Sequence, residues 1–138
     1  MLVYHPIDIG IPITGRCSDL LVFDWQKSAA DFSIHGDEEH VLRVLFKGAV
    51  IARLLDETWL STESDPATWV GLVPHHFAYR VEGAVFAQTQ SPLLAEMVDR
   101  PLIHYQFVTG SGCLDALTTW DAEFSLVART SAGHQAAP

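Results

Sequence analysis

The chain has 138 residues, of which 49% are hydrophobic and 18% charged, and its formal net charge at pH 7 is −9. This hydrophobic fraction excludes a disordered or fibrous polymer, and the length suits one domain with its own core. Only eight Lys and Arg residues are available to contact phosphates, which argues against a nucleic-acid-binding protein. We therefore expect a single β-rich globular domain over residues 1–129 and a disordered tail over residues 130–138.

The cysteines and the apolar runs predict a location in the cell. Cys17 and Cys113 are too few for a disulfide framework, which favours two reduced thiols over a single bridge. The first residues lack the basic segment and apolar segment of a signal peptide. The most apolar stretch, residues 41–55, is interrupted by basic side chains and is shorter than the roughly 20 residues that cross a bilayer. The expected location is the cytoplasm, with no membrane association.

The N-terminal segment has a regular apolar pattern. Residues 5–15 read HPIDIGIPITG, and isoleucine on alternate positions puts these side chains on one face of an extended chain. Pro12 cannot donate a hydrogen bond to a sheet, which favours an edge position. The segment is predicted to be either an edge strand of the domain's own sheet or an arm laid across a second copy. In the second case the partner is another copy of the chain, and the homodimer is held through Ile7, Ile9, Ile11 and Ile13.

The next apolar runs predict β-strands. Residues 20–25, with the sequence LLVFDW, indicate one buried strand, and residues 31–35 indicate another. Residues 40–46 and 50–55 predict a hairpin that turns at Gly48, because most of their residues are β-branched, aromatic or leucine. A helix is the competing interpretation, but Gly48 would then lie in its middle at a cost of about 1 kcal/mol.

The second half of the chain predicts further strands and one helix. Residues 77–90 indicate a strand or a hairpin that turns at Glu82-Gly83. Ser91 and Pro92 have the form of a helix cap and first helical residue, so one short helix is expected near residues 92–99. Three closing strands are expected at residues 102–109, 113–119 and 123–129. The predicted fold is α+β and mainly antiparallel β, arranged as a sandwich or a partly open barrel.

Seven histidines in a small acidic chain suggest acid–base or metal chemistry. The adjacent His75 and His76 point to opposite faces of a strand, and the chain contains neither HxH nor HxxxH, so we expect no metal site. The alternative is a site assembled from distant parts of the chain. In that alternative, His76, His104 and a nearby carboxylate serve a small enzyme or a metal-dependent hydrolase.

Motifs for nucleophilic catalysis and for nucleotide binding are absent. The chain contains no G-x-S-x-G, Walker A or G-x-G-x-x-G sequence. The acidic residues between positions 56 and 65 are oxygen ligands of the kind that hold Ca²⁺, but they lack the EF-hand order, so a solvated loop is the simpler interpretation. We expect no cofactor.

Loop aromatics carry the functional hypothesis. Trp59, Trp69 and Trp120 lie in or beside polar loop sequence, whereas Trp25 ends an apolar run. Such side chains either line a ligand pocket or cap the ends of a core. The residues predicted to line a pocket are Trp59, Trp69, His75, His76 and His104. The favoured function is a non-catalytic binding or oligomerising protein whose partner is a protein or a small molecule.

Overall fold

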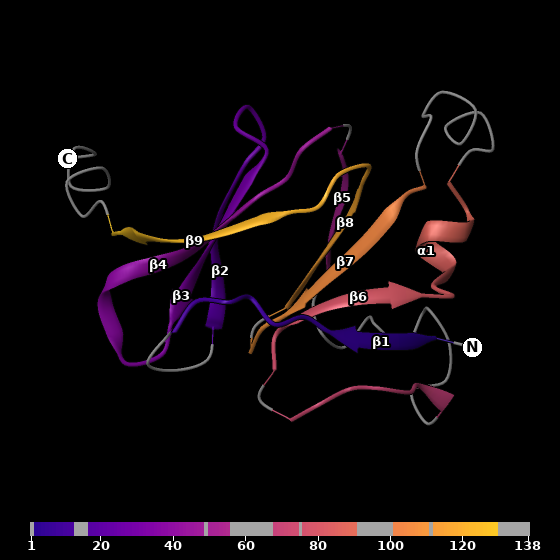
Figure 1. The fold of residues 1–138 in the computed structure, drawn as a ribbon, viewed down its shortest axis with the longest axis horizontal. Coiled ribbons are helices and arrows are strands. Elements are labelled where there is room, and N and C mark those ends of the chain that lie inside the picture. The colour runs from indigo at the N-terminus through magenta and orange to yellow at the C-terminus, as the bar shows by residue number, and fades with distance from the viewer. Residues whose placement is uncertain are drawn as a thin grey trace.

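The structure is a computed structural model that describes residues 2–12, 17–48, 50–55, 68–74, 76–90, 101–110 and 112–129. This part of the chain forms two antiparallel sheets and one short helix, with the sheets facing each other across the molecule (Figure 1). Within these ranges neither sheet closes into a barrel. The predicted antiparallel α+β fold is confirmed, and of its two arrangements the structure has the sandwich-like one.

The larger sheet, sheet A, has the strand order β1-β6-β7-β8-β5. Its strands are β1 (Val3–Pro6), β5 (Val50–Leu55), β6 (Ala78–Glu82), β7 (Ile103–Val108) and β8 (Cys113–Thr118). The smaller sheet, sheet B, has the order β2-β3-β4-β9. Its strands are β2 (Cys17–Asp24), β3 (Ala29–Ile34), β4 (Asp37–Leu45) and β9 (Glu123–Ala128). The helix α1 (Val85–Gln88) follows β6, and no helix of the described chain has the length and hydrophobicity of a membrane span.

The predicted strands form, but the predicted hairpin between residues 40–46 and 50–55 is wrong. β4 pairs with β3 and β9, whereas β5 pairs with β8 in the other sheet, so the chain between β4 and β5 crosses from one sheet to the other. The crossing is held by the connection between β8 and β9. Thr118 donates a hydrogen bond from its hydroxyl to the carbonyl of Lys47 (2.6 Å), and a Cβ at Gly48 would collide with Thr119 and Trp120. These tertiary contacts replace the strand pairing that a local turn predicts.

The region after β6 also differs from its prediction. Only the first part of residues 77–90 is a strand, and Tyr79 pairs with Gln106 of β7 while Val85–Gln88 is helical. The helix expected near residues 92–99 lies outside the described residues. Trp25, predicted to end a buried strand, lies in a turn with 65% of its surface exposed.

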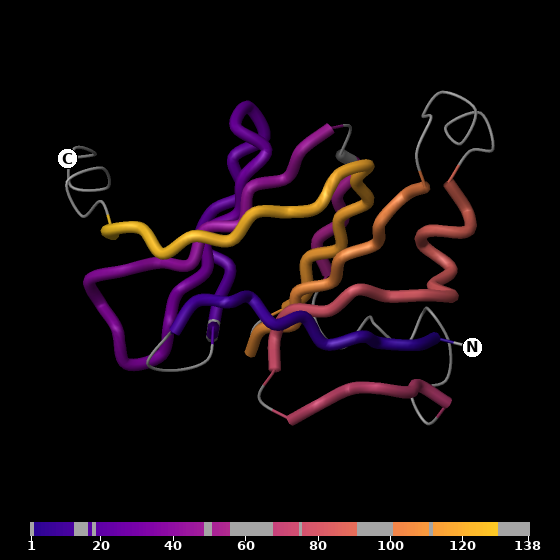
Figure 2. The backbone as a smooth tube through the Cα atoms, viewed as in Figure 1, coloured from indigo at the N-terminus to yellow at the C-terminus, as the bar shows by residue number. Residues whose placement is uncertain are grey.

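The N-terminal segment packs against its own domain. β1 is an edge strand paired with β6, and the chain after it runs across to sheet B (Figure 2). Ile7, Ile9 and Ile11 pack, partly buried, against the core, and the amide of Ile7 donates a hydrogen bond to the carbonyl of Ala78 (3.0 Å). Ile13 lies outside the described residues. The edge strand expected over residues 5–15 forms only at its start, because β1 ends at Pro6 and the isoleucines lie in the irregular chain that follows it. Exchange of this segment with a second copy stays a prediction.

The core between the sheets is aromatic. The ring of Phe107 lies 5.3 Å from that of Phe32, 5.9 Å from that of Phe46 and 5.9 Å from that of Phe77. A second buried cluster lies on the opposite face of sheet A and consists of Leu2, Tyr4, Tyr79, Val81 and Ala84. The part of sheet A around β1 and β6 is therefore covered on both faces, and the polar side chains of Gln106 and Asp115 in the middle strands are buried.

Both cysteines are free and buried, and burial raises the pKa of the Cys17 thiol to about 12. At pH 8 only about one Cys17 side chain in ten thousand is then a thiolate, the form that attacks disulfide reagents. We expect native protein to react with neither thiol during a few minutes in Ellman's reagent, and unfolded protein to titrate both. Rapid labelling of Cys17 in the native Cys113→Ser variant would contradict this expectation.

Candidate functional site

A row of polar side chains crosses the outer face of sheet A. The strand register places Tyr79 opposite Gln106, Gln106 opposite Asp115, and Asp115 opposite Arg53. Side chains that are direct partners in neighbouring strands lie on the same face of a sheet. The adjacent residue Leu114 belongs to the core between the sheets, so the polar row lies on the face turned away from sheet B.

Asp115 is the centre of this row. Its carboxylate is fully buried, and Oδ1 accepts hydrogen bonds from Nε2 of His104 (2.7 Å) and Nε2 of Gln106 (2.8 Å). Oδ2 accepts hydrogen bonds from Nε (3.1 Å) and Nη2 (2.9 Å) of Arg53. Four donor atoms from the two strands that flank β8 therefore converge on one buried carboxylate, which we call the Asp115 cluster (Arg53, His104, Gln106 and Asp115).

The Asp115 cluster keeps its carboxylate ionised. Burial by itself raises the pKa of Asp115, but the hydrogen bond and charge of His104, with smaller contributions from Gln106 and Arg53, lower it further than burial raises it. The net result is a pKa below the ordinary value of 3.8. Asp115 is therefore negatively charged at neutral pH, and the guanidinium of Arg53 neutralises that charge inside the protein.

Phe86 of α1 covers the cluster. The Cζ atom of Arg53 lies 4.3 Å from the centre of the Phe86 ring, a cation–π distance, and the ring of His104 lies 5.6 Å from it. The side chain of His104 is only 4% exposed. A general base must reach the proton that it abstracts, so the imidazole is closed to a substrate in this arrangement.

Two polar atoms of the cluster have no hydrogen-bond partner. Nδ1 of His104 and Oε1 of Gln106 are both buried, and neither has a hydrogen-bond partner among the described residues. Because Nε2 of His104 lies against a carboxylate, it donates, and the other ring nitrogen is left without a contact. An unmet buried polar atom has an energetic cost, so these two atoms lower the net stabilisation that the cluster contributes.

His76 lies away from this cluster. Its Nε2 donates a hydrogen bond to the carbonyl of Ile7 (2.9 Å), and its ring packs edge-on against that of Tyr79, 5.2 Å away. The β6–β7 register, continued by one residue, places His104 opposite Val81, near the end of β6, whereas His76 lies before the first residue of that strand. The structure pairs His104 with a carboxylate, as the enzyme hypothesis requires, but it does not bring His76 to that pair.

A cavity of about 520 Å³ opens beside His76. The described residues that line it come from the start of β2, the chain before β6 and β6 itself, and the end of β7 with the chain after it. They are Cys17, Leu72, Val73, Pro74, His76, Phe77, Tyr79, Val108, Thr109 and Gly110. None of these side chains is a carboxylate, a lysine or an arginine, so the described wall is mostly apolar.

The polar groups around this cavity are held in place by the chain itself. The hydroxyl of Tyr79 accepts a hydrogen bond from the amide of Val73 (3.1 Å) and donates one to the carbonyl of the same residue (3.0 Å). The hydroxyl of Thr109 donates to the carbonyl of Gly112 (2.8 Å). These bonds fix the loop before β6 and the loop after β7, so the cavity is formed before any ligand arrives.

The remaining predicted site residues have other positions. Trp69 packs against Tyr4, with ring centres 5.9 Å apart, in the second buried cluster. Trp59 and His75 lie outside the described residues. Trp120 is half exposed in the turn before β9. Of the five predicted pocket residues, the structure places His76 on the cavity of about 520 Å³ and His104 in the Asp115 cluster. His104 also lines a second cavity, of about 420 Å³, although its side chain is only 4% exposed.

Sequence reasoning did not single out Arg53, Gln106, Asp115 or Phe86. A signal for two of them was present, because Arg53 and Asp115 each interrupt an otherwise apolar strand, VIARLL and CLDALT. A charged residue inside a buried strand requires an opposite charge nearby, which would have suggested that the two strands are neighbours. Phe86 carries no comparable signal.

In the described part of the chain, no three His, Cys, Asp or Glu side chains are grouped so as to hold a metal ion. No protein-family model, no curated protein and no solved structure matches this chain.

Proposed function

We propose that this chain is a non-catalytic binding protein, and that its ligand is a small, uncharged, mostly apolar molecule held in the cavity beside His76. The observation that carries this proposal is the cavity, whose volume of about 520 Å³ lies within the range of about 300 to 1,000 Å³ common for ligand sites. Its described wall combines apolar side chains with a few fixed polar groups. The free cysteines favour the cytoplasm as the place where it acts.

The wall also indicates the chemistry of the ligand. A charged ligand would need an opposite charge to replace its hydration, and the described wall has no carboxylate, lysine or arginine to supply one. The Nε2 of His76 donates to the carbonyl of Ile7, so a neutral ring presents Nδ1 as an acceptor. A hydroxyl group on an apolar ring system matches this combination.

A second candidate is an acid–base enzyme built on His104 and Asp115. The observation that favours it is the 2.7 Å bond between Nε2 of His104 and the carboxylate, with Nδ1 unpartnered. It requires a rearrangement that exposes the imidazole, because the side chain of His104 is only 4% exposed. Turnover of a chromogenic ester by the native protein, lost in the His104→Gln variant, would support this candidate over the binding protein.

The binding proposal is tested with 2-naphthol, an uncharged aromatic alcohol, by titration and by NMR shifts of the cavity residues. We expect Val73→Trp to weaken binding at least tenfold, because the larger side chain fills the cavity. Val70→Trp is the matched control, since Val70 is 49% exposed and Val73 is 46% exposed, but Val70 does not line the cavity. The anion 2-naphthalenesulfonate should bind more weakly than 2-naphthol.

Failure of the native protein to bind 2-naphthol, or equal affinities in the native, Val73→Trp and Val70→Trp proteins, would overturn the proposal. Circular dichroism spectra of both variants establish that any loss of binding reflects the cavity and not the fold.

A further inference from the structure

Strand β9 is an edge of sheet B without the usual protection. Within the described chain it pairs only with β4, in a register with no bulge. Residues 124–128 contain no charge and no proline, the features that normally prevent an edge strand from pairing with another molecule. The other edge of this sheet, β2, has two register shifts, and β1 is covered by hydrogen bonds to Val70.

The backbone of β9 shows which of its residues face outward. The amide of Arg129 donates a hydrogen bond to the carbonyl of Glu39 on the β4 side (2.7 Å). Because the amides and carbonyls of successive residues alternate in direction along a strand, those of Ser125 and Val127 also point toward β4. The amides and carbonyls of Phe124, Leu126 and Ala128 therefore point away from sheet B.

We propose that β9 pairs in antiparallel fashion with β9 of a second copy, about a two-fold axis at Leu126. Leu126 then lies opposite the partner's Leu126, and Phe124 opposite the partner's Ala128. The outward-facing residues meet one another, so each chain uses its unpaired amides and carbonyls in a ladder. Sheet B becomes a continuous eight-stranded sheet in the dimer, twice the four strands of one copy.

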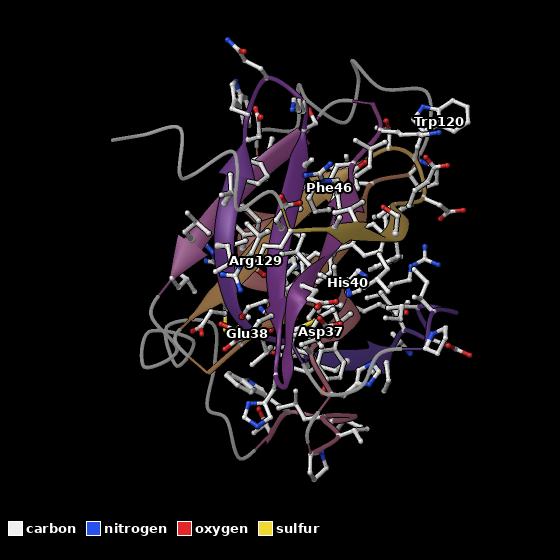
Figure 3. The ribbon with its side chains drawn as sticks, turned by 90° about the vertical axis from the view of Figure 1, so that its left-hand side faces the viewer. Asp37, Glu38, His40, Phe46, Trp120 and Arg129 are labelled. Carbon is white, nitrogen blue, oxygen red and sulfur yellow. The ribbon has the colours of Figure 1, made fainter. Side chains whose placement is uncertain are left out.

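Charge complementarity supports this register. Glu123 and Arg129 are the two charged residues that flank the uncharged part of β9, and they lie near its opposite ends. Figure 3 shows Arg129 on the side of the molecule that also carries Asp37 and His40. In the proposed pairing, Glu123 lies opposite the partner's Arg129 on the same face, and the two-fold axis repeats the contact. Glu123 is exposed and also bonds Lys47 (3.0 Å), which holds it beside this edge.

Apolar surface gives the pairing a second source of stability. Leu126 is 39% exposed, although its direct partner in β4, Leu42, is fully buried. A second β9 would cover it on the axis with an identical side chain. The proposal is independent of the cavity ligand, because no described residue lining that cavity belongs to β9.

The test is sedimentation equilibrium of the full chain over a range of concentrations. We expect a dimer in which Glu123→Arg and Arg129→Glu each weaken association at least tenfold, while the double variant with both substitutions restores it. Leu126→Lys should give a monomer, because two ammonium groups then meet on the axis. Leu21→Lys is the matched control, at a leucine of β2 that is 40% exposed, and should leave the dimer intact.

A monomeric native chain would overturn the proposal. So would a dimer that survives Leu126→Lys, since it would use another surface such as the N-terminal segment. A third outcome is a full chain that stays monomeric while a chain shortened to end at Arg129 dimerises. Residues 130–138 would then block the edge in the full chain, and the proposal would fail for it. Circular dichroism of each variant separates loss of pairing from loss of fold.

Discussion

Asp115→Ala is expected to lower the free energy of unfolding by about 3 to 5 kcal/mol. The substitution leaves the guanidinium of Arg53 without its counter-charge and removes the acceptor of His104 and Gln106 in a fully buried site. Restoring these groups to water requires the strands to separate, so the loss appears as reduced stability. Urea unfolding followed by tryptophan fluorescence measures it.

The chain contains a matched control for this result. Asp31 and Arg43 also form a two-bond carboxylate–guanidinium pair, across β3 and β4, in which Arg43 bonds both carboxylate oxygens (2.8 and 2.9 Å). The Asp31 side chain is 19% exposed, whereas that of Asp115 is not exposed. Water can solvate the group that remains, so Asp31→Ala should cost no more than about 1 kcal/mol. Equal costs for the two substitutions would show that burial does not set the strength of the Asp115 cluster.

The pH dependence of stability provides an independent measurement of Asp115. Its pKa is lowered in the folded protein, whereas in the unfolded chain it is close to 3.8. The stabilisation is therefore present above about pH 4 and is lost as the pH falls through the lower, folded-state pKa. We expect the free energy of unfolding to fall more steeply below pH 4 in the native protein than in Asp115→Asn, and parallel curves would contradict the assignment.

Gly71→Ala is expected to be the second most damaging substitution, at about 3 kcal/mol or more. Gly71 has φ +97°, where a side chain is strained by about 1 to 2 kcal/mol, and a Cβ there would also collide with the backbone carbonyl of Tyr4. Val70 beside it exchanges hydrogen bonds with Leu2 and Tyr4, so relieving the collision pulls this segment away from β1.

Gly36→Ala separates the cost of backbone strain at positive φ from the cost of the collision with Tyr4. Gly36 has φ +86°, and a Cβ there would meet no atom within 4 Å, so only the backbone strain applies. We expect it to cost about 1 to 2 kcal/mol in the same urea experiment. If Gly71→Ala costs no more than Gly36→Ala, then the close approach between residue 71 and Tyr4 does not stabilise the fold.

The candidate site was only partly predictable from the sequence. His76 and His104 were singled out by residue type, and the structure gives each a definite contact, the carbonyl of Ile7 and the carboxylate of Asp115. Their separation was not predictable, because no local pattern says how far one histidine on β7 lies from another before β6. The role of Phe86 depended on a helix turn in a segment that local propensity assigns to a strand.

The sequence by itself determined where most of the strands lie, since β-branched and aromatic runs bury best in an extended, half-covered conformation. It did not determine the helical turn at Val85–Gln88. Only the tertiary structure decided which strands are neighbours. Gly48 suits both a hairpin turn within one sheet and a crossing between two sheets. Contacts from Thr118 and Trp120, about 70 residues away, make it a crossing. Arg53 and Asp115, 62 residues apart, likewise become an ion pair because long-range pairing sets β5 beside β8.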